Sequence, residues 1–479
     1  MRLLRRRPDQ GLSPARLSYP EALEALESRG RFGIHLGLSR TRALLAELGH
    51  PERSFRGALI AGTNGKGSVL ALTGAALRAA GYRIGETPKP HLVTYRERLQ
   101  IDGEPVDPET FATVTGEVLA VADRVARRHG EPTEFELLTA IAFRWFAESG
   151  VDLAVVEVGL GGRLDATHAW DGGVAVVTNV SLDHTDRLGL TVEAIAREKA
   201  AIIMRGDLAV TGARDPALGI VERRSRRVGA PLVVAPPAPL RGFDRDGIEV
   251  ELGRLGRVRV GLRGRHQAAN VAVADATLDA LEAAGIARVN AEQRRAGYAA
   301  VRWPGRLELV EVAGREVLLD GAHNPAGAAS LAQALDDMAP FLGSGRPTLV
   351  LAVMADKDVE GVSRALAGSA YLAGARVIAT APDVERALPP EQLAARWTRA
   401  TGLSAETIAE PADARDAALG GGGGRGAGSS DGRGGGRGGR GGPVIVAGSL
   451  YLVGLARALL LPDPSLQPDP PPFKRESIP

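Results

Sequence analysis

The stretch GTNGKGS, residues 62–68, combines three glycines with a lysine and a serine. It follows the apolar run GALIAG (57–62) and leads into GSVLALTGAALRAAGY, a predicted helix that stops near Gly81. A strand, a glycine-rich turn and a helix in this order can bind phosphate, because backbone N–H groups and the helix N-terminus face the anion. Lys66 would add positive charge and Ser68 would reach a metal ion.

The spacing of this loop differs from the common phosphate-binding motif, which has four residues between two glycines and then Lys followed directly by Ser or Thr. Here only Thr63 and Asn64 separate Gly62 from Gly65, and Gly67 separates Lys66 from Ser68. The alternative is an ordinary tight turn with a lysine that faces solvent. The combination of residue types favours a phosphate site but does not define its reaction.

Two further polar groups follow apolar runs that predict strands. Glu157 begins EVGLGGRLDAT (157–167), and His184 lies in TNVSLDHTDRLG (178–189) with Asp183 and Asp186. Parallel sheets bind ligands at the carboxyl ends of their strands, and Mg²⁺ prefers oxygen ligands there. Hydrogen-bonded polar groups at a sheet edge are the alternative. Lys199 lies on the next predicted helix, where a lysine is most often a surface residue.

The elements that must position these residues alternate along the chain, as in parallel α/β layers. Most of the predicted strands are apolar throughout, as in sheets covered on both faces. They are 57–62, 152–159, 174–180, 316–322, 348–354, 376–381 and 443–448. Period-two alternation in 241–264 predicts antiparallel hairpins instead.

A change of pattern near WPGRLELV (303–310) predicts a domain boundary between about residues 299 and 307. The expected organisation is a first domain at 1–300, which carries the phosphate loop, and a second α/β domain at 301–462. A glycine- and arginine-rich segment, 419–442, is predicted to be a disordered surface loop inside the second domain. The proline-rich tail, 463–479, is predicted to be disordered as well.

Composition and net charge exclude only a few classes of protein. The 479 residues are 44% hydrophobic, enough for two or three domains, and 59 basic residues nearly balance 57 acidic ones. No strong field therefore argues for nucleic acid or a membrane surface. The chain has 0 cysteines, no signal-peptide pattern and no apolar run of membrane-spanning length, so a cytoplasmic protein is the expectation.

Ten motifs together resemble one known family. They are GTNGKGS, PHLVTYRERLQIDG, EFELLTA, EVGLGGRLDAT, NVSLDHTDRLG, EKA, GRHQAANVAVA, WPGRLE, LDGAHNPAG and GSLYLVG. In this order, from about residue 15 to 460, they resemble the folylpolyglutamate synthase/dihydrofolate synthase family, ATP-dependent ligases related to the Mur ligases. Each motif alone is modest, and the series is specific.

The resemblance implies a fold and a reaction. The N-terminal domain would be a P-loop ATPase-like parallel sheet with a small antiparallel part, and the C-terminal domain would be Rossmann-like α/β. ATP and Mg²⁺ would be the cofactors. A folate or dihydropteroate carboxylate would attack the γ-phosphate of ATP, and the amine of L-glutamate would then attack the acyl phosphate. A monomer without nucleic-acid or membrane partners is the expectation.

The resemblance also assigns residues by motif. Gly62, Thr63, Asn64, Gly65, Lys66, Gly67 and Ser68 would hold the phosphates, with Asn270, Arg306 and Asp320 as further ATP contacts. Ser68, Glu157, His184 and Lys199 would bind metal, Lys199 after carbamylation. Lys66, Lys199, Asp320 and His323 would act in catalysis, and His91, Arg96, Arg98, Phe135 and Ser449 would contact substrates.

Two positions depart from the family pattern. Lys89 stands where the family usually has a serine that helps to hold the first Mg²⁺. Either Ser68 and water replace that ligand, or the ammonium contacts phosphate directly. His168 stands where the family usually has asparagine.

Two other functions remain open from the sequence. A Mur-type ligase of cell-wall precursors is one, although no separate UDP-binding domain precedes the loop at residue 62. A nucleotide-dependent RNA-binding protein that uses the Arg-Gly repeats of 419–442 is the other, and a plain surface insertion is the favoured interpretation of those repeats.

Overall fold

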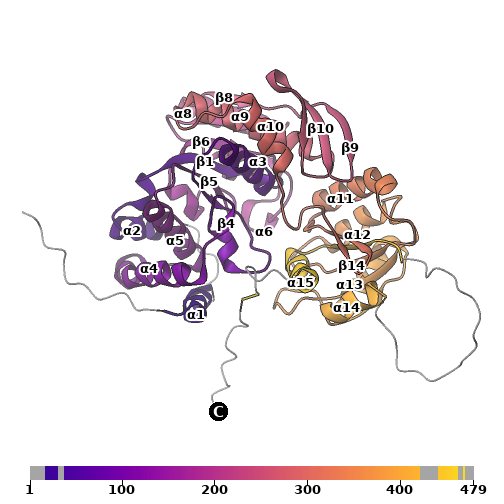
Figure 1. Ribbon diagram of the computed structural model, residues 1–479. Helices are drawn as coiled ribbons and strands as arrows, with labels where there is room; N and C mark the ends of the chain where they lie inside the picture. The colour runs from indigo at the N-terminus through magenta and orange to yellow at the C-terminus, as the bar shows by residue number, and fades with distance from the viewer. Residues whose placement is uncertain (1–16, 31–36, 421–440, 462–467, 470–479) are drawn as a thin grey trace, which may run out of the picture.

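The computed structural model describes residues 17–30, 37–420, 441–461 and 468–469. The elements form two lobes, the N-terminal lobe (17–301) and the C-terminal lobe (described residues of 305–461), which lie next to each other in Figure 1. The predicted α/β fold is confirmed. The predicted loop 419–442 and tail 463–479 fall almost wholly outside the described residues and stay predictions.

The N-terminal lobe is built on an eight-stranded sheet in the order β4-β3-β2-β5-β1-β6-β7-β8. All pairs from β2 to β8 are parallel, whereas β3 and β4 pair antiparallel at one edge. The strands are β1 (Arg56–Ala61), β2 (Ile84–Thr87), β3 (Gln100–Ile101), β4 (Glu104–Pro105), β5 (Leu153–Glu157), β6 (Gly173–Val177), β7 (Leu208–Thr211) and β8 (Leu232–Val234).

Successive residues of β1 point to two different cores, because side chains alternate across a sheet. Leu59 and Ala61 belong to one buried cluster, and Ala58 and Ile60 to the other. Helices cover the first face with α1 (Tyr19–Gly30), α2 (Ser39–Glu47), α4 (Pro108–His129), α5 (Glu134–Ser149), α7 (Val192–Ala200) and α8 (Ala217–Val228). The second face carries α3 (Lys66–Ala79), α9 (Gln267–Ala283) and α10 (Ala291–Ala300).

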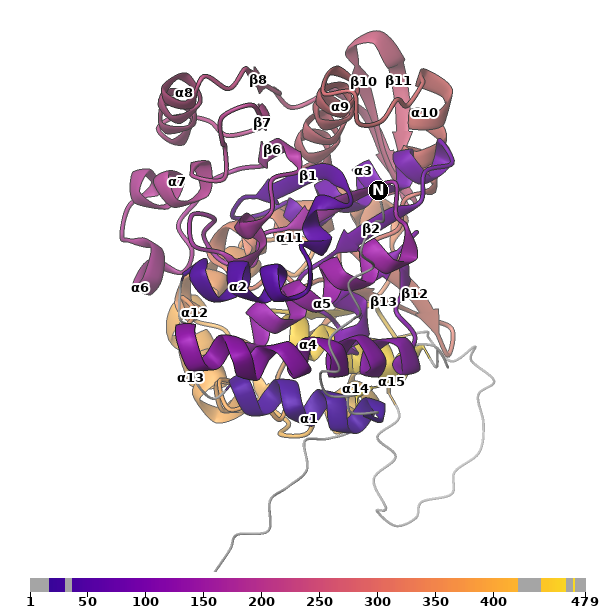
Figure 2. The same ribbon diagram turned by 90° about the vertical axis from the view of Figure 1, so that its left-hand side faces the viewer.

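A three-stranded antiparallel sheet joins the second core, as the alternation in 241–264 predicts. It consists of β9 (Leu240–Asp244), β10 (Gly247–Leu252) and β11 (Gly256–Val260). Figure 2 shows β10 and β11 beside α9 and α10. This sheet also contacts the C-terminal lobe, since the rings of Phe243 and Phe341 meet edge to face with centroids 6.1 Å apart.

The C-terminal lobe holds a six-stranded sheet in the order β12-β13-β17-β14-β15-β16. Only β12 runs antiparallel to its neighbour. The strands are β12 (Glu308–Val312), β13 (Arg315–Leu319), β14 (Thr348–Leu351), β15 (Arg376–Ala379), β16 (Glu406–Thr407) and β17 (Val444–Ala447). One face packs on α11 (Pro325–Met338), α12 (Val359–Ala367) and α13 (Pro390–Thr401), the other on α14 (Pro411–Ala418) and α15 (Leu450–Leu460).

Short turns complete the path. They are the 3₁₀ helices η1 (Pro51–Arg53), η2 (Tyr95–Arg98), η3 (Ala166–Ala169), η4 (Gly253–Leu255) and η5 (Ala339–Phe341), together with the one-turn helix α6 (Thr185–Leu188). Within the described ranges, no helix combines the length and apolar character needed to span a membrane.

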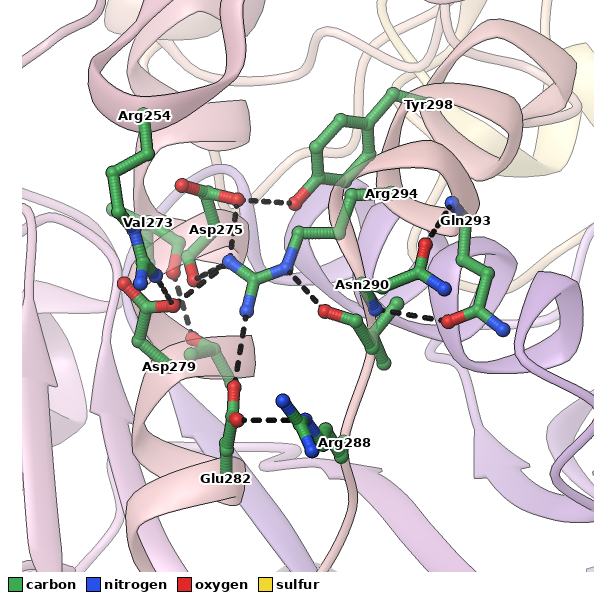
Figure 3. Close-up of polar contacts among 12 residues, drawn as sticks. Arg254, Val273, Asp275, Asp279, Glu282, Arg288, Asn290, Gln293, Arg294 and Tyr298 are labelled. Carbon is green, nitrogen blue, oxygen red and sulfur yellow. Dashed lines mark hydrogen bonds and ion pairs between the residues drawn. The ribbon is translucent and has the colours of Figure 1, made fainter.

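A buried arginine fastens α10 to α9 (Figure 3). The Arg294 side chain, 4% exposed, contacts Asp275 at 2.9 Å, Asp279 at 2.8 Å and Glu282 at 3.9 Å. Its Nε also donates to the backbone carbonyl of Val289 at 3.0 Å. Removing this cation takes a buried charge partner from three carboxylates, which keep only weaker or exposed partners in Tyr298, Arg254 and Arg288, and leaves the Val289 carbonyl without its donor.

We therefore expect Arg294→Met to lower the free energy of unfolding by about 2 kcal/mol in urea titrations, less than for a fully enclosed pair because water reaches Asp279. Arg288→Met is the matched control. Arg288 is 84% exposed and pairs with Glu282 at 3.2 Å, so its loss should change stability by about 0.5 kcal/mol or less. Equal effects of the two substitutions would contradict this account.

Candidate active site

The glycine-rich loop leaves β1 at Ala61 and enters α3 at Lys66. Gly65 has φ +82°, and a Cβ there would lie 2.3 Å from Asn270 Oδ1. A Cβ on Gly62 would lie 1.9 Å from Thr178 Oγ1. Both glycines are therefore required by close approach, and Gly65 also by its left-handed backbone.

The end of β6 holds the loop in place. Thr178 Oγ1 donates to the carbonyl of Asn64 at 2.7 Å. The Asn64 N–H donates to Asn179 Oδ1 at 2.9 Å, and the Thr63 N–H to the Asn179 carbonyl at 2.9 Å. The loop is thus fixed before any ligand arrives, as a preorganised anion site requires.

A cavity of about 610 Å³ opens above this loop, with walls from both lobes. The N-terminal lobe contributes the whole loop from Gly62 to Ser68. Its other lining residues include Lys89, Arg98, Phe135, Glu157, Asp183, His184, Lys199 and Asn270. The C-terminal lobe contributes Arg306, Asp320, His323, Asn324 and Leu450, among others. Residues from motifs more than two hundred positions apart therefore share one cavity.

Glu157 is the buried carboxylate at the end of β5. Lys66 Nζ lies 3.8 Å from its Oε1, and the Lys89 N–H donates to its Oε2 at 3.0 Å. Burial raises the pKa of Glu157, although both lysines oppose the shift. The site thus holds an ionisable oxygen group that a nearby cation stabilises.

Lys89 lies deeper than a surface lysine. Its Nζ donates to the backbone carbonyl of Glu157 and sits 4.7 Å from the centre of the Phe135 ring. Burial lowers the pKa of Lys89 to about 8, against the opposing charges of Asp165 and Glu157. A positive charge therefore stands beside Glu157 where the family pattern has a neutral hydroxyl.

Lys199 and His184 border the other side of the loop. Lys199 Nζ donates to the carbonyl of Gly62 at 2.9 Å, and burial lowers its pKa to about 7. His184 adopts the left-handed backbone conformation, φ +48°, and burial lowers its pKa too. Both groups therefore favour their neutral forms more than they would in water.

The donor set for a metal is small. Among the side chains described, no group of three or more His, Cys, Asp and Glu residues is placed to hold a metal ion. Ser68, Glu157, His184 and Lys199 do line the same cavity as the phosphate loop. Such a set fits Mg²⁺, which is usually held by one or two carboxylates, substrate phosphates and water rather than by a closed protein cage.

The C-terminal lobe presents Asp320, Arg306 and His323. Asp320 accepts the N–H groups of Leu307 at 2.8 Å and Ala322 at 2.9 Å, and burial raises its pKa despite Arg306 nearby. His323 Nδ1 donates to the carbonyl of Gly321 at 2.8 Å. Burial lowers the pKa of His323 to about 4, so its ring is neutral near pH 7.

Asp183 connects the two lobes across the cavity. Lys357 Nζ lies 3.1 Å from its Oδ1, and Asn324 Nδ2 donates to its Oδ2 at 3.1 Å. Burial opposes ionisation, but Lys357 and His184 lower the pKa of Asp183 to about 2. Lys357 was not among the sequence candidates. Its place just after the buried strand TLVLAVM, the rule that identified Glu157, is the signal that could have found it.

The predicted substrate contacts fall into two groups. Arg98 and Phe135 line the cavity. The described wall of the cavity does not include His91, Arg96 or Ser449. His91 accepts from Arg98 Nε at 2.8 Å, Arg96 donates to the Val106 carbonyl at 3.1 Å, and Ser449 caps α15 by accepting the Tyr451 N–H at 3.2 Å. Their contact with substrate stays a prediction.

Comparisons with known proteins agree with this geometry. The Mur ligase middle domain matches residues 60–278, and the Mur ligase glutamate ligase domain matches 305–425. The dihydrofolate synthase/folylpolyglutamate synthase of Bacillus subtilis is 34% identical over 73% of this chain and 83% of its own length. The protein of that name from Mycobacterium tuberculosis is 40% identical over 70% of this chain and 72% of its own.

Solved structures give the same result over nearly the whole chain. The M. tuberculosis folylpolyglutamate synthase complexed with ADP and AMPPCP superposes with a TM-score of 0.80 at 33% identity, covering 92% of this chain and 99% of that one. Escherichia coli FolC in complex with DHPP and ADP gives 0.77 at 29% identity, covering 94% and 99%. The chain belongs to the folylpolyglutamate synthase/dihydrofolate synthase family of Mur ligases.

Proposed function

We propose that this protein is an ATP-dependent ligase that adds L-glutamate to a folate through an acyl phosphate. The supporting observation is a single cavity in which the phosphate loop and Lys66 face Asp320, Arg306 and His323 of the other lobe. Relatives with the activity in their names match both lobes, and solved relatives carry ADP or AMPPCP.

The reaction needs two displacements. An oxygen of the folate carboxylate attacks the γ-phosphorus of ATP, and the bond to the ADP oxygen breaks. The amine of glutamate then attacks the acyl carbon, inorganic phosphate leaves with that carboxylate oxygen, and the amine loses a proton. Neither step requires a cysteine or serine nucleophile, so positioning and charge neutralisation are the main contributions of the protein.

Individual side chains fit these needs. The loop N–H groups and Lys66 would bind the phosphates, and Arg306 would neutralise charge from the C-terminal lobe. Asn270, next to Gly65, would lie on the nucleotide side. His323, neutral at pH 7 with its Nε2 not engaged by the Gly321 carbonyl, would hydrogen-bond a phosphate oxygen or accept a proton.

Mg²⁺ bound with the nucleotide would be held by Ser68, Glu157 and His184, where it would neutralise charge on the phosphates. Lys199 would join this set after carbamylation. Its lowered pKa of about 7 supports that role, because only a neutral amine reacts with carbon dioxide.

An assay with two acceptors decides which compound receives the glutamate. ADP release should be measured with ATP, Mg²⁺ and glutamate in the presence of either dihydropteroate or tetrahydrofolate. Turnover with tetrahydrofolate identifies polyglutamylation, and turnover with dihydropteroate identifies dihydrofolate synthesis as well. Absence of turnover with both would overturn the proposal.

The position of Lys89 beside Glu157 predicts that replacing this lysine changes the Mg²⁺ concentration that the enzyme requires. Its ammonium stands beside Glu157 and competes with any other cation for that carboxylate. We expect Lys89→Ser to lower the half-saturating Mg²⁺ concentration for ADP release by about tenfold, from a charge interaction of about 1.4 kcal/mol. Lys89→Met, which removes the charge without adding an oxygen, should shift it in the same direction but less. An unchanged or higher Mg²⁺ requirement in both would contradict the prediction.

A further inference from the structure

Asp469, beyond the end of α15, contacts the N-terminal lobe. Its Oδ1 accepts the Tyr19 hydroxyl at 2.5 Å and the Thr94 hydroxyl at 2.7 Å. Its Oδ2 accepts the backbone N–H of Tyr95 at 2.8 Å. Three donors therefore converge on one carboxylate, and hydrogen bonds to an ionised acceptor are stronger than those between neutral groups.

Two of these donors belong to the segment Leu92–Arg98, which carries η2. Thr94 is fully buried, and Glu97 closes the segment by accepting the N–H groups of Leu92, Val93 and Thr94 at 2.7–2.9 Å. Glu97 thus satisfies the amides on the inner side of the turn. Asp469 satisfies the next amide, Tyr95, from outside.

The same segment carries Arg98 to the cavity wall. The Arg98 guanidinium lies over the Tyr95 ring, 5.0 Å from its centre, and Arg98 Nε donates to His91 Nδ1 at 2.8 Å. The His91 and Tyr95 rings are also in contact, with centroids 4.5 Å apart and planes tilted by 46°. Arg98 is therefore held by Tyr95, whose N–H binds Asp469, together with His91 and with Glu134, whose Oε1 lies 4.0 Å from Arg98 Nη1.

The first residue of the segment, Leu92, contacts the C-terminal lobe. A Cβ on Gly454 of α15 would lie 1.8 Å from the carbonyl oxygen of Leu92, so the helix and the segment are in direct contact. Asp469 and α15 therefore both contact the segment that carries Arg98, at Tyr95 and at Leu92 respectively.

We propose that Asp469 is a positioning residue for the acceptor substrate: it fixes Leu92–Arg98 from outside so that Arg98 points into the cavity. This role rests on the proposed function, because the acceptor is an anionic folate whose carboxylate Arg98 would bind. The phosphate loop lies on other elements, β1 and α3, so nucleotide binding does not depend on Asp469.

The test compares Asp469→Ala and Asp469→Asn with Pro468→Ala, an exposed neighbour, in the full-length protein. Hydrogen–deuterium exchange of peptides covering 92–98 and the KM values for tetrahydrofolate and ATP are measured. Asp469→Ala should speed exchange of the Tyr95 amide and raise the KM for the folate about tenfold, with kcat and the KM for ATP within about twofold. Asp469→Asn, which keeps one accepting oxygen, should fall between, and Pro468→Ala should match the unsubstituted protein.

Three results would overturn the role of Asp469. They are an unchanged KM for the folate in Asp469→Ala, whether or not exchange becomes faster, a matching rise in the KM for ATP, and the same change in Pro468→Ala. Absence of turnover in the unsubstituted protein would instead overturn the proposed function, so the two failures are distinguishable.

Discussion

Replacing Lys66 with alanine is expected to lower kcat/KM by about a thousandfold, the upper range for losing one preorganised donor to developing charge. Lys66 begins α3 inside the phosphate loop, its Nζ donates to the Thr63 carbonyl at 3.2 Å, and it faces Glu157 at 3.8 Å. No other lysine occupies the loop, and the further cations that line the cavity, Lys89, Lys199 and Arg306 among them, come from other segments.

The measurement is steady-state ADP release with both acceptors, accompanied by thermal unfolding. Lys66→Arg is the matched control, because it keeps the charge with a different geometry and should retain part of the activity. Unchanged rates in Lys66→Ala, with the protein folded, would show that the nucleotide binds elsewhere.

Replacing Glu157 with glutamine should be nearly as damaging to activity and harmless to the fold. Glutamine keeps the shape and an oxygen that accepts the Lys89 N–H at Oε2, but it removes the negative charge opposite Lys66. A metal ligand and the charge balance of the phosphate site are lost together, and we expect kcat to fall by about a hundredfold to a thousandfold.

The same substitution should also affect the stability of the fold, in a direction that follows from the pKa of Glu157. Burial raises the pKa of Glu157, so the folded state holds a proton on this carboxyl more readily than the unfolded state does. Because Glu157 ionises less readily in the folded state, the free energy of unfolding falls as the pH rises from the pKa of the unfolded state through the raised pKa of the folded state. A neutral glutamine avoids that loss, and the melting temperature near pH 7 should stay equal or rise. A large drop in melting temperature, or full activity, would contradict the assignment of Glu157 to the reaction.

Much of the fold could be predicted from the sequence, because the strands that build both cores are strongly apolar. The runs at 57–62, 152–159 and 443–448 became β1, β5 and β17, each buried on both faces. Short or partly polar strands carry too little hydrophobic pattern to be predicted from the sequence. β2, with the sequence IGET, was not anticipated, although it pairs with β5 in the parallel sheet.

The site was predictable where a motif places a residue at the carboxyl end of a strand. Glu157 is the last residue of β5, His184 lies in the segment after β6, and Asp320 directly follows β13; all three reach the cavity. The directions in which the side chains of PHLVTYRERL point could not be predicted. Arg96 and Arg98 differ by two positions, yet η2 turns one toward the Val106 carbonyl and the other toward the cavity.

Contacts between distant segments were beyond the sequence for a physical reason. The partnership of Lys357 with Asp183, and of Asp469 with Tyr95, depends on how the two lobes pack, and periodicity describes only single elements. The proline-rich composition of 463–479 favours disorder, and composition carries no information about a single anchoring carboxylate.

In the proposed reaction the carboxylate of the acceptor becomes an acyl phosphate in the cavity between the lobes. The most direct test supplies a folate acceptor labelled with ¹⁸O in its carboxylate, together with ATP, Mg²⁺ and glutamate, and analyses the released phosphate by mass spectrometry. An acyl-phosphate route yields ADP and inorganic phosphate that carries one ¹⁸O atom for each amide formed. Unlabelled phosphate, or label released in AMP, would contradict it.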